Sequence, residues 1–450
     1  MKQAKIVTSV YSVDLFGICS LLYELGGLIV MHDASGCNST YATHDEPRWY
    51  DMDSMIYISG LTEFDAVMGN DEGFIEDVLE IARERHPRFI AVFGSPVAMI
   101  MGTDFRGIAR IIERRSGIPC FGFETSGMRT YVSGAAQAMT ALVRRLLAEP
   151  EAFGIRAPAG TPSSPAFSPA SVPEAAAGQP YQVRDGAAAG GGPADRPLRI
   201  NLLGVTPLDF SVMGNVAALQ AWCREMGFQV WTTWCMGDFL EDLARAPEAD
   251  VDLVCSAMAL PAAKELQVRY GIPYVIGLPY GTGAGKALAR AIRRAAGARN
   301  GGLSGERDEC FSPDIFGTSE GGEACLSGSP KILLIGEPVA CGSLRVSLEA
   351  AGAGVVRLVD PLEDLGVPLR PGDVRTDAEE DLRRLIGEAD LVIADPLYRR
   401  LLPEADQGKL IRLPHEAYSG RMYRAEIPVL VGEAWDRWLE KKLPPAFRRA

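Results

Sequence analysis

Two stretches poor in aliphatic residues interrupt the 450-residue chain and divide it into three blocks. Residues 150–197 are rich in Pro, Ala, Gly and Ser, and residues 297–329 are again rich in Gly and Ser. Because neither stretch has the periodicity of a helix or a strand, we predict that both are linkers. Each remaining block has to bury a core of its own, which predicts domains at residues 1–149, 198–296 and 330–450.

Each block alternates short apolar runs with stretches of helical spacing. The apolar runs suit strands that are buried on both faces of a parallel sheet; they lie at residues 89–93, 198–203, 331–335 and 391–394. The pattern predicts an α/β fold made of three doubly wound, Rossmann-like parallel-sheet domains. Ligands of such sheets bind outside the carboxyl ends of the strands, so we expect the site in a cleft there.

Charge and hydropathy exclude several classes of function. The net charge is −13, from 58 acidic against 45 basic residues. An acidic chain lacks the excess of positive charge with which proteins bind nucleic acid, so we do not expect nucleic acid as a partner. No run approaches the ~20 apolar residues of a membrane-spanning helix. The N-terminal residues carry no apolar signal core, so we expect a cytoplasmic protein whose nine cysteines are reduced thiols.

The segment Gly281–Lys286 resembles a phosphate-binding loop at first sight. A P-loop requires a glycine that is separated from the Gly-Lys pair by four residues, and that position is Tyr280. The residue after the lysine is Ala287, which offers no hydroxyl for magnesium. We therefore interpret the segment as a strand-to-helix turn and predict no nucleotide site in this chain.

Four residues are candidates for binding inorganic groups: Cys19, Cys37, Cys255 and His415. A glycine lies close to Cys19 and directly before Cys37, which lets the backbone approach a bulky group, and thiolates are the usual ligands of iron–sulfur clusters. Two thiols are half of a four-thiolate set, so a partner chain would have to complete the cluster. From spacing alone, burial in the core is the competing interpretation of both cysteines.

In combination these motifs resemble the nitrogenase component 1 family, whose subunits contain three α/β domains. The segment from His32 to Cys37 is similar to the family's His-Gly-Pro-x-Gly-Cys motif, although Asp33 and Ala34 replace Gly-Pro. The segments Ser59–Asn70 and Val97–Asp104 resemble the family segments that follow. The resemblance implies that Cys19 and Cys37 bind a cluster at a subunit interface, either [4Fe–4S] or a larger one of the P-cluster type.

The same resemblance assigns a second site. The spacing from Cys255 to Tyr270–Pro273 resembles the surroundings of the cysteine that holds the catalytic cofactor in nitrogenase α subunits. His415, followed by Tyr418-Ser419-Gly420, resembles the histidine at the opposite end of that cofactor, with one residue deleted in the alignment. The resemblance therefore implies a complex iron–sulfur cofactor held between Cys255 and His415.

Two departures from the family pattern affect the expected chemistry. Pro96 occupies the position of a third interface-cluster cysteine, so further donors for a larger cluster would be Ser95 or Cys120. No histidine occurs between His86 and His415, so the family's histidine-rich cofactor segment is missing. Dinitrogen is therefore not the expected substrate.

The resemblance implies an oxidoreductase: a metal-cluster-binding subunit of a nitrogenase-like reductase complex. Its partners would be a second component 1 subunit, either a β-like chain or a second copy, and an ATP-dependent iron–sulfur reductase protein. Methylthio-alkane reductases, which reduce small organic sulfur compounds, are the best-fitting branch. An assembly scaffold for the nitrogenase cofactor, a tetrapyrrole reductase of the same superfamily and a purely structural partner subunit are the alternatives. The sequence leaves the substrate, the heterometal, the subunit composition and the catalytic residues open.

Overall fold

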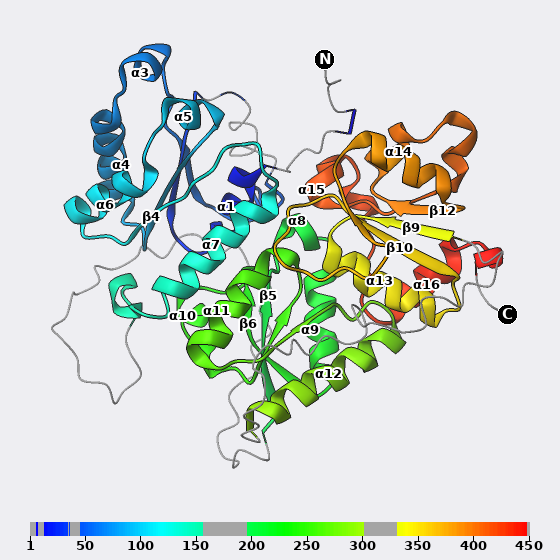
Figure 1. Cartoon of the computed structure of the whole chain (residues 1–450). Coiled ribbons are helices and arrows are strands. Elements are labelled where there is room, and N and C mark those ends of the chain that lie inside the picture. Colours follow the sequence, from blue (N-terminus) through cyan, green and yellow to red (C-terminus); the bar gives the residue numbers. More distant parts are fainter. Residues whose placement is uncertain are drawn as a thin grey trace. The chain divides into compact units, whose positions relative to one another are not determined.

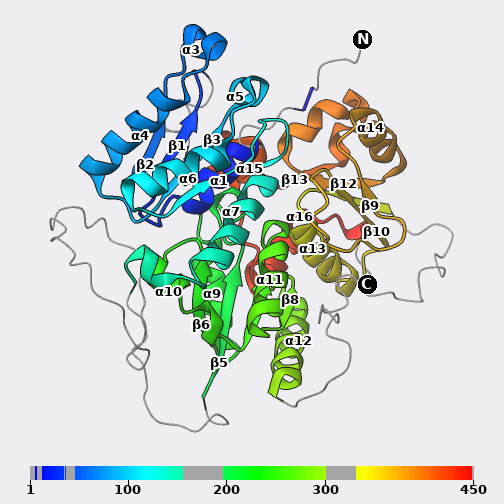
Figure 2. The same cartoon turned by 60° about the vertical axis from the view of Figure 1, so that its left-hand side comes forward.

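The computed structural model describes residues 6–7, 13–34, 36, 46–155, 196–300 and 331–447. The chain divides into two compact units, which are drawn in Figures 1 and 2. The first unit comprises Val13–Arg196 and Thr232–Pro247; the second comprises Met1–Ser12, Pro197–Trp231 and Glu248–Ala450. Each unit is described by itself below.

Three sheets form the framework, which confirms the predicted fold class of three parallel-sheet α/β domains. The first sheet has the strand order β2-β1-β3-β4, with β1 at Leu28–His32, β2 at Met55–Ile58, β3 at Ile90–Gly94 and β4 at Cys120–Gly122. The second has the order β6-β5-β7-β8, with β5 at Leu198–Leu203, β6 at Phe228–Trp234, β7 at Val251–Val254 and β8 at Tyr274–Ile276. The third has the order β11-β10-β9-β12-β13, with β9 at Lys331–Ile335, β10 at Val355–Asp360, β11 at Val374–Arg375, β12 at Leu391–Ala394 and β13 at Leu410–Arg412.

Strand order reverses once in each sheet. In each sheet, the first strands are added on one side of the starting strand, and the later strands are added on its other side. The reversal lies between β1 and β3 in the first sheet, between β5 and β7 in the second, and between β9 and β12 in the third. At such a switch point the connections after the two strands diverge, which leaves a crevice at their carboxyl ends. Each reversal is therefore a place where this fold builds ligand sites.

The helices of the first unit cover its sheet. They are α1 (Asp14–Leu22), α3 (Glu63–Met68), α4 (Asp71–Arg85), α5 (Pro96–Met101), α6 (Phe105–Ser116), α7 (Tyr131–Arg145) and α10 (Leu240–Leu243). Apolar side chains of α4 and α6 form one core with residues of β1 and β3. Figures 1 and 2 show α4 beside α6 and α1 beside α7.

The contact between α1 and α7 depends on two glycines. A Cβ placed on Gly17 would lie 1.9 Å from the carbonyl oxygen of Tyr131, and one on Gly134 would lie 1.9 Å from that of Asp14. Only glycine permits backbones to approach this closely. The aromatic and aliphatic side chains of both helices are buried as a result.

The helices of the second unit follow the strands of its two sheets. They are α8 (Pro207–Phe210), α9 (Asn215–Glu225), α11 (Leu260–Tyr270), α12 (Thr282–Asn300), α13 (Pro338–Ala350), α14 (Glu379–Glu388), α15 (Glu416–Ser419) and α16 (Glu433–Lys442). Short 3-10 helices occur in both units; they lie at Pro150–Phe153, Ala246–Glu248, Ala257–Ala259, Pro396–Leu401, Glu404–Lys409, Gly420–Met422, Arg424–Glu426 and Pro445–Phe447. Among the described residues, no helix is both long and apolar enough to cross a membrane.

The glycine-rich segment before Lys286 forms the start of α12. There, a carboxylate oxygen of Asp436 accepts a hydrogen bond from the backbone N–H of Thr282 at 3.0 Å. A phosphate bound at a helix N-terminus would require the same N–H groups. The carboxylate of Asp436 occupies that place, and Thr282–Lys286 lies within the first turns of α12.

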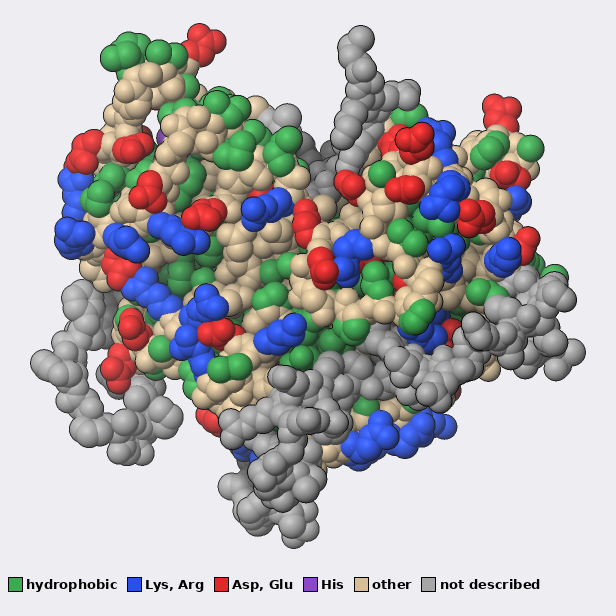
Figure 3. All heavy atoms as spheres, in the orientation of Figure 1, with side chains coloured by type: hydrophobic (Ala, Val, Ile, Leu, Met, Phe, Trp, Pro, Cys, Tyr) green, Lys and Arg blue, Asp and Glu red, His purple; other side chains and the backbone are tan. Residues whose placement is uncertain are grey.

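On the face drawn in Figure 3, acidic and basic side chains intermingle over much of the described surface. Hydrophobic side chains gather at the tip of the first unit, over α3 and α5. They include Phe64, Val67 and Ile100, which are 72, 83 and 80% exposed. Exposed apolar groups on two adjacent helices form a patch of the kind found at interaction sites.

Candidate functional site

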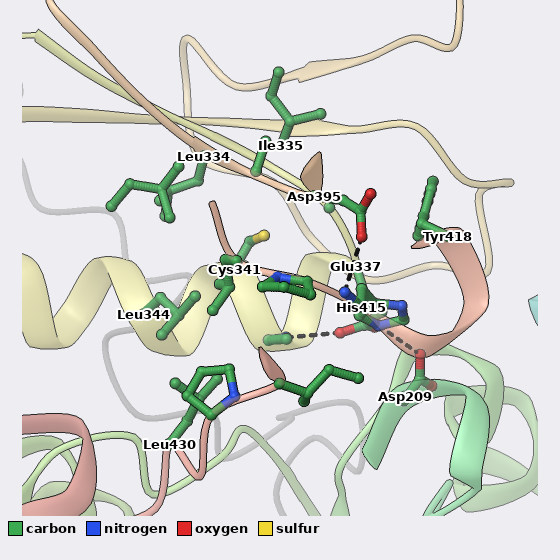
Figure 4. Close-up of a pocket in the computed structure, with 18 of the residues that line it drawn as sticks. Asp209, Leu334, Ile335, Glu337, Cys341, Leu344, Asp395, His415, Tyr418 and Leu430 are labelled. Carbon is green, nitrogen blue, oxygen red and sulfur yellow. Dashed lines mark hydrogen bonds and ion pairs between the residues drawn. The ribbon is translucent and has the colours of Figure 1, made fainter. Parts of the chain in front are cut away.

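A cavity of about 60 Å³ lies at the carboxyl end of the third sheet, in the second unit (Figure 4). Glu337 follows β9 and Asp395 follows β12, so both flank the point where the strand order reverses. His415 lies shortly after β13, and Asp209 is supplied by α8. The site therefore forms where the topology of the sheet leaves a crevice.

His415 occupies the N-cap position of α15. Its backbone N–H donates to a carboxylate oxygen of Asp395 at 2.9 Å, and its ring nitrogen Nε2 lies 3.3 Å from Oδ1 of Asp209 (Figure 4). The ring also meets Tyr418 edge-on, with centroids 5.5 Å apart. Backbone and ring of His415 are thus held by two different carboxylates.

Glu337 is the N-cap of α13 and is almost fully buried. Its carboxylate accepts hydrogen bonds from the backbone N–H groups of Ala340 at 2.7 Å and Ala257 at 2.8 Å. Burial raises the pKa of Glu337 to about 8, and the nearby negative charge of Asp209 adds to the effect, although three backbone donors, those of Ala340, Ala257 and Val339, oppose it. Glu337 is therefore an acid that can hold or release a proton beside the cavity near neutral pH.

Cys255 directly follows β7, at the reversal of the second sheet. Its backbone N–H donates to the carbonyl of Leu203 at 2.9 Å, and its thiol lies 3.4 Å from the carbonyl oxygen of Leu253. Burial, followed by the charges of Cys223 and Glu337, raises the pKa of this thiol well above its ordinary value. Cys255 is thus held as a neutral thiol in the interior.

The two predicted cofactor ligands differ in their access to the cavity. His415 lines it, whereas Cys255 is not among its lining residues. A cavity of about 60 Å³ has room for a few water molecules. A cofactor of several irons held between Cys255 and His415 therefore does not fit this closed arrangement, and binding one would require a rearrangement that opens Cys255 to the cavity.

The predicted interface-cluster ligands lie in the first unit. Cys19, in the middle of α1, is fully buried, and its Sγ lies 3.9 Å from the sulfur of Met31. Burial, together with the charge of Glu46, raises the pKa of its thiol well above the ordinary value. Cys37 lies outside the described residues. Within the described part of the chain, no group of three or more His, Cys, Asp or Glu side chains is placed to hold a metal ion, so cluster binding by Cys19 and Cys37 stays a prediction.

The proline at the third cysteine position has a local structural role. Pro96 is the first residue of α5, and the side chain of Ser95 caps this helix by accepting from the backbone N–H of Val97 at 3.3 Å. Proline suits the first helical position because the N–H that it lacks would have no partner within the helix. Cys120, the other candidate donor, is a buried residue of β4.

Sequence reasoning missed the carboxylates of the site. Glu337 and Asp395 each come within two residues of the end of a predicted buried strand, at residues 331–335 and 391–394. Carboxylates just after such runs were a usable signal, because parallel strands bring their carboxyl ends to one edge. Asp209 carried no comparable signal, since α8 is only four residues long.

A model of the family of nitrogenase component 1 type oxidoreductases matches residues 26–330. The chain belongs to this family. The match covers most of the first two predicted domains and confirms the family resemblance. Membership places the chain among nitrogenase-like oxidoreductases.

Relatives within the family have different roles. The nitrogenase iron-molybdenum cofactor biosynthesis protein NifE of Klebsiella pneumoniae is 24% identical over 353 residues, which cover 77% of this chain and 66% of that protein. NifE of Methanosarcina barkeri is 24% identical over 53% of this chain and 44% of its own length. One of the subunits of light-independent protochlorophyllide reductase from Halorhodospira halophila is 36% identical over 25% of this chain and 22% of its own length. The chain therefore spans less than two thirds of these relatives.

Solved structures show the same fold. The structure titled "Nitrogenase Cp1 at pH 5" superposes with a TM-score of 0.59 at 14% identity, covering 99% of this chain and 91% of the other. A second, "Nitrogenase Cp1 at pH 6.5", gives a TM-score of 0.51 at 15% identity, covering 98% and 73%. At these identities the likeness establishes the nitrogenase component 1 fold alone.

Proposed function

We propose that this chain is the metal-cluster-binding subunit of a nitrogenase-like reductase complex that reduces a small substrate. The observation that carries the proposal is the cavity at the carboxyl end of the third sheet, which His415, Glu337 and Asp209 line, with His415 Nε2 3.3 Å from Asp209 Oδ1. The chain belongs to a family of oxidoreductases, and its cavity is lined by a protonatable acid and an imidazole. Such a site suits reductions that consume protons together with electrons. Electrons would come from a separate ATP-dependent iron–sulfur reductase protein.

The chain's own residues would bind and orient the substrate and supply protons. Glu337, whose pKa lies near neutrality, would deliver a proton to a group bound in the cavity. The apolar lining around it, including Leu334, Ile335 and Leu344, would exclude water. The small volume favours compact substrates, and small organic sulfur compounds of the methylthio-alkane type are the proposed class.

Metal binding is the second part of the proposal. Cys19 and Cys37 would hold an iron–sulfur cluster, [4Fe–4S] or a larger P-cluster-like one, shared with a second component 1 subunit that is either a β-like chain or another copy. Cys255 and His415 remain the proposed ligands of a complex iron–sulfur cofactor. Because the thiol of Cys255 is closed off from the cavity here, this ligation predicts a conformational change on loading.

Iron content tests this part. Protein purified without oxygen should contain iron and acid-labile sulfide, and a Cys37→Ala, Cys255→Ala double variant should lose most of both. Cys223→Ala provides a matched control, because Cys223 is a buried cysteine of α9 that the proposal does not use. Equal iron in the wild type and the double variant would overturn metal binding at these residues.

A cofactor-assembly scaffold is the second candidate function, and the extent of the similarity to NifE favours it. A scaffold would use the same residues but would pass its metal group on without turnover. Substrate reduction at steady state with the reductase protein and MgATP supports the reductase. Transfer of iron to an apo acceptor without turnover supports the scaffold.

Tetrapyrrole reduction is the third candidate, and the local similarity to light-independent protochlorophyllide reductase motivates it. A tetrapyrrole needs a wide apolar pocket, whereas the cavity beside His415 measures about 60 Å³. Visible absorption after incubation with a tetrapyrrole separates this candidate from the other two, because only a binder shifts the spectrum.

A further inference from the structure

We propose that Asp209 is a positioning residue for His415: its carboxylate accepts the Nε2–H of the imidazole and so leaves Nδ1 as the basic atom of the ring. The inference rests on the proposed function only in assigning His415 to the site. It concerns the protein before any substrate or metal is bound.

The geometry singles out Asp209 among the carboxylates of the site. Its side chain is 6% exposed, and Oδ1 lies 3.3 Å from Nε2 of His415, which is within reach of a hydrogen bond (Figure 4). Asp395 also binds His415, but through the backbone N–H. These two carboxylates hold different parts of the same residue.

A second contact fixes α8 against α15. The hydroxyl of Ser211, directly after α8, donates to a carboxylate oxygen of Glu416 at 2.8 Å. Glu416, the residue after His415, is itself held by the guanidinium of Arg424 at 2.7 Å. Because α8 and α15 are joined at two points, Asp209 cannot drift from the ring without breaking a buried hydrogen bond.

The chemistry of imidazole explains what this contact does. A neutral histidine ring has one N–H donor and one acceptor nitrogen, and the partner of one nitrogen decides the state of the other. A carboxylate can only accept, so it selects the tautomer with hydrogen on Nε2. Carboxylates play this orienting role for histidines whose other nitrogen binds a metal or takes a proton.

Nitrogen NMR of ¹⁵N-histidine-labelled protein tests the inference, and the chain is well suited because it has only four histidines. A His415→Gln variant assigns the resonances of this ring. In metal-free wild-type protein at alkaline pH, we expect the Nε2–H tautomer in large excess over the Nδ1–H tautomer among the neutral rings of His415. An excess of the Nδ1–H tautomer, or an equal mixture, would overturn the proposal without any variant of Asp209.

The Asp209→Asn variant supplies the second arm. Its amide can donate to Nε2 as well as accept from it, so it no longer selects one tautomer and we expect the Nε2–H share to fall. Asp395→Asn is the matched control, because it changes a carboxylate that contacts only the backbone of His415; its tautomer ratio should stay that of the wild type. Near-UV circular dichroism, compared with the wild type, reports whether each variant folds. An unchanged ratio in Asp209→Asn, or the same change in Asp395→Asn, contradicts the inference.

Because neither the reductase protein nor turnover is involved, this result is independent of whether the proposed function holds.

Discussion

Glu337 and Ala257 connect two sheets of the second unit: the carboxylate of Glu337, after β9, accepts the backbone N–H of Ala257, just after β7, at 2.8 Å. Ala257 is two residues beyond Cys255, and Glu337 lines the cavity that His415 also lines. One carboxylate thus links the loop that carries the predicted thiol ligand with the cavity that holds the predicted imidazole ligand. Changes at Glu337 are the most direct way to disturb both.

Replacing Glu337 by alanine should destabilise the protein strongly. The change leaves the N–H groups of Ala257 and Ala340 without their acceptor, and each buried donor left unsatisfied costs about 1–3 kcal/mol. We expect a loss of about 3 kcal/mol or more in the free energy of unfolding, measured by urea denaturation. Glu349→Ala, at the exposed end of the same helix, removes only a pair with Arg370 and should cost less than about 1 kcal/mol. Equal losses in the two variants would contradict the role of Glu337.

The raised pKa of Glu337 predicts a pH dependence of stability. A carboxyl whose pKa is about 8 in the folded protein and 4.5 when unfolded binds more protons in the folded state between these values. Its contribution to stability is therefore full below about pH 4.5 and is lost as the pH rises to about 8. Glu337→Gln, which cannot ionise, should remove this decline. The measurement compares urea midpoints of both proteins at pH 5, 6.5 and 8; parallel pH profiles would show that Glu337 does not titrate in this range.

Much of the framework was predictable because buried parallel strands are continuous apolar runs. The runs at residues 198–203, 331–335 and 391–394 coincide with β5, β9 and β12, and the run at 89–93 is displaced by one residue from β3. Such runs combine high β propensity with burial on both faces, so local sequence and tertiary environment favour the same structure.

The site was less predictable, because its geometry depends on contacts between residues distant along the chain. The spacing of Cys255 and His415 gave no indication that one would be enclosed in the interior while the other lines a cavity. Asp209 meets His415 across 206 positions of sequence, and no local pattern encodes that contact. Family motifs identified His415, whereas the carboxylates around it became evident only from the fold.

Two glycine-to-alanine substitutions should have opposite effects on stability, because Gly17 lies in the close contact of α1 and α7 whereas Gly387 faces open space. Gly17→Ala places a methyl group against the carbonyl of Tyr131, where a Cβ would lie at 1.9 Å, so the helices must separate. We expect a loss of about 3 kcal/mol, at the upper end of the usual cost of overpacking. Gly387→Ala, in α14, meets no atom within 4 Å and should be neutral or stabilise by up to about 0.5 kcal/mol. Thermal melts of both variants provide the measurement, and a neutral Gly17→Ala would show that the helices are not packed this closely.

The buried ion pair of Arg345 and Asp373 predicts that removing the arginine alone destabilises the protein more than replacing both partners. Arg345 donates to both carboxylate oxygens of Asp373, at 2.8 and 2.7 Å, and their side chains are only 1 and 3% exposed. Arg345→Met leaves the carboxylate of Asp373 buried without its counter-charge, which should cost about 3–5 kcal/mol in the free energy of unfolding. Adding Asp373→Asn removes that charge while keeping an acceptor for the backbone N–H of Leu358, so the double variant should recover part of the loss. The double-mutant cycle, measured by urea denaturation, gives a coupling energy; a value near zero would mean that the pair contributes no more than an exposed salt bridge.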